Sequence, residues 1–264
     1  MKIKIGVCTI LVGNPKTYKP YTEKNHMSYC NMHGYGYKCF TEALVNDVPI
    51  PFTKPEVILQ MFDEGFDYVF YTDADSFFLN KEIKLESFIQ GDYDFIATGS
   101  DFDMVGAGHL MFKNSDWSRK FIEKWVRFRQ CVSTDVIEKF KKITTHIFED
   151  VLFGNLSDQI PLNMLVSMGG VPPQENWFDI FCKVNFYTGN KFRKYSHKTH
   201  APTSDENVKR TNNLIFEEWR KNIIILKQSR VECYPNKYDR NIFMIHFVFG
   251  KKRISKFFTQ NLLD

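Results

Sequence analysis

The first half of the chain alternates short apolar runs with stretches of helical spacing. Apolar runs rich in Val, Ile, Phe and Tyr predict buried strands, whereas apolar residues three and four apart predict amphipathic helices. The predicted strands are residues 5–12, 35–40, 68–72, 94–98, 106–113 and 242–249. The predicted helices are residues 19–32, 55–62, 117–128 and 157–168, and Phe88 lies on a further short helix. This alternation predicts an α/β fold with a mainly parallel sheet.

The pattern gives no sign of a boundary within the chain. No internal repeat, low-complexity tract or clear linker interrupts the 264 residues, so residues 1–264 are interpreted as one domain. Residues 131–150 are polar and amphipathic by turns and suggest an insertion with its own helix. In the predicted helix 117–128, four aromatic residues share one face and are assigned to the core: Trp117, Phe121, Trp125 and Phe128.

Composition excludes several classes of protein. With 43% hydrophobic residues and 26 Phe, the chain can bury a core, so disorder is not expected. A net charge of only +4, without a long basic run, does not indicate a nucleic-acid binder. None of the six cysteines lies in CxxC spacing, which argues against a structural zinc site. Free buried thiols in a reducing compartment are favoured over disulfides.

The first residues imitate a short signal peptide, since two lysines precede the apolar run 5–12. No small-residue cleavage site follows, and residues 14–16 have the composition of a turn, so we interpret the run as the first strand. No run approaches the ~18–20 apolar residues that a membrane span needs. We therefore expect a soluble, cytoplasmic protein without a transmembrane anchor.

Two aspartates, Asp73 and Asp75, follow directly after the apolar run 68–72. Ligand sites of open α/β sheets lie just beyond the carboxyl ends of such strands. In a strand that continues straight, residues i and i+2 point the same way, so both carboxylates can face one ion. Paired carboxylates suit Mg²⁺ or Mn²⁺ and, through the metal, a diphosphate. The structural alternative is a solvated turn, where Asp is common.

His246 interrupts a nearly all-apolar run, and Lys251 follows shortly after it. A buried imidazole must satisfy its nitrogens by hydrogen bonds or bind a ligand, and a neutral imidazole can complete a carboxylate site for Mn²⁺. A lysine just beyond can neutralise a diphosphate as a point charge. The structural alternatives are a core histidine and an exposed basic turn.

Asp158 and Gln159 stand at the start of the predicted helix 157–168. Asp158, or Ser157 before it, can cap this helix. A carboxylate and a carboxamide presented together can also hold sugar hydroxyls or stabilise a cationic sugar transition state. The sequence pattern alone leaves both interpretations open.

Together these motifs resemble glycosyltransferase family 34, the galactosyl-, mannosyl- and xylosyltransferases of GT-A fold. The matching residues are Tyr29, 33–35, Lys54, 68–75, 78–80, 106–118, Trp125, 158–159, 173–174, 246–247 and Gly250. Glycogenin-like enzymes of family 8 share the DxD motif, an Asp-Gln pair and a late His-x-x-Gly-x-x-Lys element. Here Lys251 directly follows the glycine, so the late element departs from that relative. Gly106 stands where family 34 usually has Asn, and its usual membrane-anchored stem is not found in the sequence.

The resemblance implies a GT-A type, Rossmann-like fold whose mixed, mainly parallel sheet is flanked by helices. A nucleotide-binding half would span about residues 1–100 and an acceptor-binding half about residues 101–264. The implied activity is metal-dependent, retaining transfer of a hexose or pentose from a UDP-sugar or GDP-sugar to a glycan hydroxyl. The implied partners are the nucleotide-sugar donor and a glycan or glycoprotein acceptor, without nucleic acid.

The resemblance also assigns roles to individual residues. Asp73, Asp75 and His246 would bind Mn²⁺, with Mg²⁺ as the alternative ion. The nucleotide and diphosphate of the donor would be contacted by Thr9, Lys54, Asp73 and Lys251. Asp158 and Gln159 would lie beside the reacting sugar.

Two rival functions use the same motifs differently. A haloacid-dehalogenase-type phosphatase also places DxD after an apolar strand. It requires that strand near the N-terminus, a small or β-branched residue at the position of Phe77 and a later acidic pair, and the sequence meets these requirements poorly. A non-catalytic glycan-binding module on a transferase fold would not need the intact Asp-Gln pair and late histidine. Mn²⁺-dependent binding of nucleotide sugars discriminates between a transferase and such a module.

Overall fold

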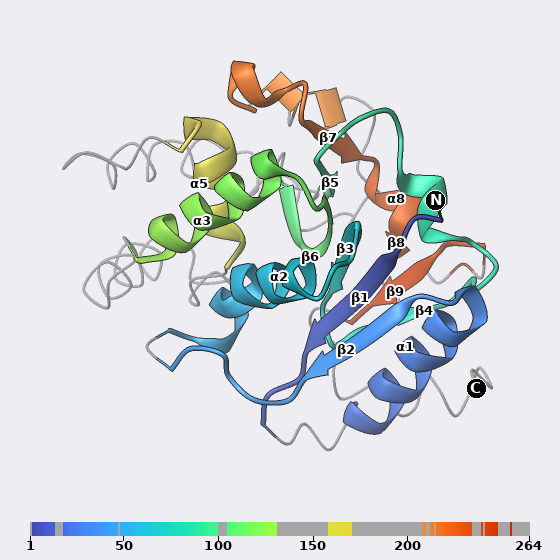
Figure 1. Cartoon of the computed structure of the whole chain (residues 1–264). Helices are drawn as coiled ribbons and strands as arrows, with labels where there is room; N and C mark the ends of the chain where they lie inside the picture. Colours follow the sequence, from blue (N-terminus) through green and yellow to red (C-terminus); the bar gives the residue numbers. More distant parts are fainter. Residues whose placement is uncertain are drawn as a thin grey trace, which may run out of the picture.

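A six-stranded sheet forms the centre of the computed structural model (Figure 1). The structure describes residues 2–13, 18–46, 48–99, 105–130, 158–170, 208–209, 212–213, 215–233, 239, 241–247 and 254. The strands are β1 (Ile5–Ile10), β2 (Gly36–Phe40), β3 (Tyr68–Thr72), β5 (Phe95–Gly99), β6 (Val105–Lys113) and β7 (Ile223–Leu226), in the order β2-β1-β3-β6-β5-β7. Three neighbouring pairs are parallel, and β6 runs antiparallel to both β3 and β5. The predicted mixed, mainly parallel α/β sheet is confirmed.

Helices cover both faces of this sheet (Figure 1). They are α1 (Lys19–His33), α2 (Lys54–Asp63), α3 (Asp116–Gln130), α5 (Gln159–Met168) and the short α8 (Gln228–Val231), with 3₁₀ turns η1 (Ile50–Thr53), η2 (Leu85–Phe88) and η3 (Glu217–Trp219). Alternate residues of β1 separate two cores, as the pleat of a strand requires. Cys8 packs with α2 and α3, whereas Val7 packs with Tyr29 of α1.

A second, three-stranded sheet was not expected from the sequence. It has the order β4-β9-β8 and consists of β4 (Ser76–Phe78), β8 (Glu232–Cys233) and β9 (Met244–His246). Antiparallel pairing of β4 with β9 places His246 opposite Ser76, the residue after Asp75. The amide of Phe247 also donates a hydrogen bond to the carbonyl of Asp75 at 3.0 Å. This pairing joins the end of the chain to the acidic motif.

Most predicted elements agree with the structure to within a residue or two. The interval 68–72 is reproduced as β3, and Gly169 ends α5 in the left-handed conformation with φ 65°. The predicted strand 242–249 is shorter, since β9 covers three residues and residues 248–249 lie outside the described part. The suggested insertion 131–150 lies outside it as well.

The described cysteines are free thiols, as predicted: Cys8, Cys30, Cys39 and Cys233. Burial raises the pKa of Cys30 to about 12, so this thiol stays protonated at neutral pH. Cys131 and Cys182 lie outside the described residues. Among the described helices, none is long and apolar enough to cross a membrane.

Candidate metal and donor site

Asp73 and Asp75 lie in a turn between β3 and β4, so the condition of a strand that continues straight through them is not met. The amide of Ser76 donates a hydrogen bond to the carbonyl of Asp73 at 3.1 Å and closes the turn. Asp75 is nevertheless only 8% exposed, which also excludes a fully solvated turn. The turn redirects the chain from the large sheet into the small one, and the two carboxylates stay on the side of His246.

Side chains of α1 hold this turn and β4 in place. The Thr22 hydroxyl donates to the Ala74 carbonyl at 2.6 Å, Asn25 bonds both backbone groups of Phe78, and His26 Nε2 lies 2.8 Å from the Ser76 carbonyl. Burial lowers the pKa of His26 to about 4, so its ring is neutral and donates through Nε2. The helix thereby satisfies backbone groups of β4 that a neighbouring strand would otherwise bond.

The three predicted metal ligands come together. One ligand atom each from Asp73, Asp75 and His246 lies within 4.8 Å of the other two. His246 Nε2 is 3.4 Å from Asp75 Oδ1 and 3.8 Å from Asp73 Oδ2. His246 is 8% exposed, and Asp73 is partly exposed, so the group lies at the border between interior and solvent.

The chemistry of this group fits Mn²⁺ or Mg²⁺. Two carboxylates and one imidazole nitrogen offer hard ligands that leave coordination positions for phosphate oxygens. Gly108 on β6 keeps the space beside them free. A Cβ at this position would stand 2.8 Å from His246 Cε1 and 3.3 Å from Asp73 Oδ2. Any larger residue at position 108 would therefore press on two of the three ligands.

Lys54, the first residue of α2, joins the acidic turn to the start of α5. Its Nζ lies 3.0 Å from Asp73 Oδ1 and 2.6 Å from Asp158 Oδ2, and it donates to the Ala107 carbonyl at 2.8 Å. An ammonium has three N–H donors, and three oxygens lie within 3.0 Å of it here. Tyr71 completes the group, because its hydroxyl donates to Asp73 Oδ1 at 2.9 Å. We call Lys54, Tyr71, Asp73 and Asp158 the Lys54 cluster.

Burial and charge act in opposite directions within the Lys54 cluster. Burial by itself lowers the pKa of Lys54, but the carboxylates of Asp158 and Asp73 outweigh it and raise the pKa above its ordinary value. Lys54 is thus a buried permanent cation. Burial raises the pKa of Asp158, and Lys54 opposes that rise. The ammonium of Lys54 compensates the negative charges of Asp73 and Asp158, so the two carboxylates can lie close together in a largely buried position.

Asp158 occupies the cap position of α5 without making a side-chain cap hydrogen bond. The capping interpretation is therefore not supported for its side chain, which instead pairs with Lys54. The first turn of α5 is fixed on β6 by neighbouring amides. Gln159 Oε1 accepts from the Ala107 amide at 3.4 Å, and Asn163 bonds the amide and carbonyl of Val105 at 2.8 and 2.9 Å.

Two further residues, Thr9 and Lys251, were predicted to contact the nucleotide-sugar donor. Thr9 lies near the carboxyl end of β1, at the same edge of the sheet as Asp73, because β1 and β3 are parallel neighbours. Its side chain is fully buried, and Oγ1 has no hydrogen-bond partner within the described part of the chain. Lys251 lies outside the described residues.

Two buried residues of the site had no predicted role. Glu232 Oε2 lies 2.8 Å from His246 Nδ1 and 2.9 Å from His109 Nε2. Burial alone would raise the pKa of Glu232, but the two imidazoles hold it well below its usual range. His109 belongs to the family-like segment 106–118, yet no chemistry was assigned to it. Glu232 stands in a region with no regular pattern, so no local signal pointed to it.

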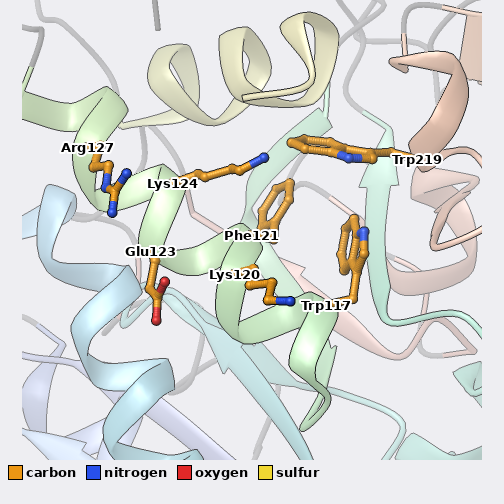
Figure 2. A pocket seen from close by; sticks show the side chains of 7 residues that line it. All are labelled: Trp117, Lys120, Phe121, Glu123, Lys124, Arg127 and Trp219. Carbon is orange, nitrogen blue, oxygen red and sulfur yellow. The ribbon is translucent and has the colours of Figure 1, made fainter. Parts of the chain in front are cut away.

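A separate hollow lies along α3 (Figure 2). It measures about 220 Å³ and is lined by Trp117, Lys120, Phe121, Glu123, Lys124, Arg127 and Trp219, which we call the α3 hollow. The rings of Trp117, Phe121 and Trp219 lie next to one another, and Lys124 points toward the Trp219 ring, with Nζ 5.2 Å from the ring centroid. None of its lining residues is a predicted site residue, so this hollow and the candidate chemistry are separate.

Residues 7–93 match the model of the galactosyl transferase GMA12/MNN10 family, glycosyltransferase family 34. The matched interval contains Thr9, Lys54, Asp73 and Asp75, and the predicted resemblance to this family is confirmed. Galactomannan galactosyltransferase 1 from Cyamopsis tetragonoloba is 22% identical over 176 residues, which cover 62% of this chain and 39% of that protein. The chain thus spans about two fifths of the length of that relative.

The whole described fold resembles a solved glycosyltransferase involved in the glycosylation of the major capsid of PBCV-1. The TM-score is 0.54 at 11% identity, over 98% of this chain and 100% of that chain. Identity this low concerns the fold alone, and the predicted GT-A type fold is confirmed. A Drosophila β1,4-galactosyltransferase 7 variant in complex with manganese, UDP-Gal and xylobiose has a TM-score of 0.34 at 12% identity, over 47% of this chain and 52% of that chain. A score at that level carries no argument for this chain.

Proposed function

From the match to the galactosyl transferase GMA12/MNN10 family, we propose that this chain is a metal-dependent, retaining glycosyltransferase. Its donor is a hexose or pentose carried on a nucleoside diphosphate, UDP or GDP, and its acceptor is a hydroxyl of a glycan or glycoprotein.

The observation that carries the proposal is the convergence of three distant segments on one edge of the sheet. Asp73 and Asp75 follow β3, Asp158 begins α5, and His246 ends β9. Lys54 connects two of these segments directly through its contacts of 3.0 and 2.6 Å. Groups suited to a metal–diphosphate and a group suited to a sugar therefore lie side by side, as donor transfer requires.

The acidic turn would hold the leaving group. Asp73, Asp75 and His246 are the residues proposed to bind Mn²⁺, with Mg²⁺ as the alternative. A divalent ion bound there neutralises charge on the departing diphosphate. Lys251 is proposed to add positive charge at the same diphosphate, and Thr9 is proposed to line the nucleotide. The hydroxyl of Thr9 supports this, because it has no hydrogen-bond partner among the described residues, whereas a buried hydroxyl normally has one.

Lys54 is proposed to position the two acidic segments. Its Nζ donates a hydrogen bond to Ala107 and forms ion pairs with Asp73 and Asp158, which favours this role over direct contact with the donor. By holding Asp73 and Asp158 together, it fixes the distance between the metal-binding turn and the sugar-binding residues.

Asp158 and Gln159 are proposed to lie beside the reacting sugar. In the expected retaining transfer, the bond from the anomeric carbon to the phosphate oxygen breaks as the acceptor oxygen attacks from the same face. The departing phosphate takes the acceptor proton. Asp158 stabilises the positive charge that develops on the sugar. Were a covalent intermediate formed, Asp158 would be the nucleophile, but its ion pair with Lys54 weakens it as a nucleophile and favours the electrostatic role.

The test is a screen of UDP- and GDP-sugars for Mn²⁺-dependent release of free UDP or GDP. We expect one donor to be cleaved in the presence of Mn²⁺ and to remain intact after chelation with EDTA. Nucleotide release that is independent of metal would contradict the metal-dependent mechanism. Absence of release with every donor and a panel of glycan acceptors, together with intact Mn²⁺-dependent nucleotide-sugar binding, would identify a binding module instead.

A further inference from the structure

We propose that Glu232 is a positioning residue of the metal site, which fixes the tautomer and the orientation of His246. The inference rests on the proposed metal-dependent function and adds a residue that lies far from the acidic motif in sequence. Glu232 itself belongs to the small sheet, on the strand β8 that runs parallel to β9.

The two ring nitrogens of His246 have different surroundings. Nδ1 lies 2.8 Å from Glu232 Oε2, whereas Nε2 faces the carboxylates of Asp75 and Asp73 at 3.4 and 3.8 Å. An ionised carboxylate only accepts hydrogen bonds, so a neutral His246 ring, which is the form that binds a metal, would carry its proton on Nδ1 and its lone pair on Nε2. Glu232 thereby directs the metal-binding lone pair of His246 toward the acidic turn.

Glu232 is itself held on both oxygens. Gln228 donates to Oε1 at 2.9 Å, and His109 Nε2 lies 2.9 Å from Oε2. The other nitrogen of His109, Nδ1, lies 3.1 Å from the hydroxyl of Thr72, the residue before Asp73. A neutral His109 that donates through Nε2 and accepts from Thr72 satisfies every member of this chain. Glu232 is 7% exposed, so water does not replace these contacts freely.

The same three side chains, His109, Glu232 and His246, could instead be taken for a second metal site, since their ligand atoms also lie within 4.8 Å of one another. The distances favour hydrogen bonding. One nitrogen of His246 and one nitrogen of His109 lie 2.8 and 2.9 Å from the same oxygen, Oε2 of Glu232. These are the separations of N–H···O hydrogen bonds. An oxygen that accepts from two N–H donors holds His246 in place by hydrogen bonding. The number of Mn²⁺ ions bound per chain distinguishes this arrangement from a second metal site.

The experiment is isothermal titration of Mn²⁺ into the full chain and into Glu232→Gln. The amide of the variant can donate to Nδ1, which would place the ring proton on Nε2, facing Asp73 and Asp75. We expect the wild-type chain to bind one Mn²⁺ and the variant to bind it about 10- to 100-fold more weakly. The control His109→Gln leaves the contact between Glu232 and His246 in place, and we expect it to weaken binding by less than about tenfold.

A double variant separates positioning from a general structural role. His246→Ala should lose Mn²⁺ affinity, and adding Glu232→Gln to it should cause no further loss, because Glu232 acts through His246. A further loss would overturn the inference. Thermal unfolding monitors folding of each variant. If Glu232→Gln does not fold, Glu232→Asp replaces it in the experiment. This variant keeps the negative charge but has a side chain shorter by one methylene, and we expect it to weaken Mn²⁺ binding as well.

The outcomes distinguish this inference from the proposed function. Wild-type binding of one Mn²⁺ with unchanged affinity in Glu232→Gln would overturn the role of Glu232 alone. Binding of two ions per chain, with one lost in His109→Gln, would assign a second metal site and overturn it as well. Absence of Mn²⁺ binding by the wild-type chain would overturn both this inference and the metal-dependent function.

Discussion

The Lys54 cluster and the α3 hollow both combine charges with aromatic rings, yet they do so in opposite arrangements. In the cluster the charged atoms are largely enclosed, and Lys54 is 2% exposed. In the hollow the aromatic side chains are the enclosed part, with Phe121 at 1% and Trp219 at 8%, while Lys120, Glu123 and Arg127 stand in solvent. Most charges of the hollow stand in solvent, whereas the cluster encloses its charges and pairs them with one another.

This difference shows which charges contribute most to the stability of the folded chain. A buried ion whose partner is removed remains uncompensated in a poorly solvated place, which is costly. A charge at an exposed rim is solvated with or without its neighbours and contributes little. Buried charges that are compensated by partners distinguish the candidate site from the α3 hollow.

The largest expected effect comes from a metal-ligand substitution, Asp75→Asn. We expect the rate of metal-dependent transfer to fall about 10³-fold or more, since a metal ion supplies several kcal/mol of charge stabilisation in the transition state. The measurement is release of UDP or GDP at saturating Mn²⁺. Asp92→Asn is the matched control, because Asp92 pairs with Lys113 at the surface and its side chain is 91% exposed. An equal loss of transfer rate in Asp75→Asn and Asp92→Asn would contradict a special role of the enclosed carboxylate.

The contrast between the Lys54 cluster and the α3 hollow is tested most directly by Lys54→Met. This substitution leaves Asp73 and Asp158 facing each other without a cation. We expect the free energy of unfolding in urea to fall by about 3 kcal/mol, the low end for a broken buried pair because Asp73 is partly exposed. Lys124→Met is the control on the α3 hollow. It removes only the cation over the Trp219 ring, and we expect a loss of about 0.5–1 kcal/mol.

Adding Asp158→Asn to Lys54→Met should recover part of the lost stability, because it removes one of the two uncompensated carboxylates. The same addition in a chain that keeps Lys54 should be destabilising. A loss in Lys54→Met no larger than that in Lys124→Met would mean that the enclosed charges are better solvated than their burial indicates.

The smallest of the three effects is expected for Gly108→Ala, which tests the space beside the metal ligands. Overpacking costs about 1–3 kcal/mol of unfolding free energy, and displacement of His246 and Asp73 should also weaken Mn²⁺ binding. Gly106→Ala is the matched control on the same strand, since its Cβ would meet Thr98 Oγ1 at 3.1 Å, away from the ligands. If both variants bound Mn²⁺ like the wild type, Gly108 would not be required for the geometry of the site.

The sequence was informative wherever a local pattern was enough. The apolar run 68–72 became β3 with its predicted bounds, and the family resemblance grouped Asp73, Asp75 and His246, whose ligand atoms lie together in the structure. Periodicity reports which side of an element is buried, and residue chemistry reports which ligands are offered. The turn at Asp73 could not be recognised in the sequence, because the hydrogen bonds that shape it come from elsewhere, one of them from Thr22 of α1.

What the sequence by itself determined was the order of the main strands and helices up to α5, apart from β4, together with the acidic pair at the end of β3 and the residue types able to bind a metal and a sugar. Only the tertiary structure decided that Lys54 joins Asp73 to Asp158, and that Glu232 supports His246 and His109. The physical reason is the range of these contacts. His109 and Glu232 are separated by 123 positions, and a hydrogen bond across that separation leaves no periodic trace in either local segment.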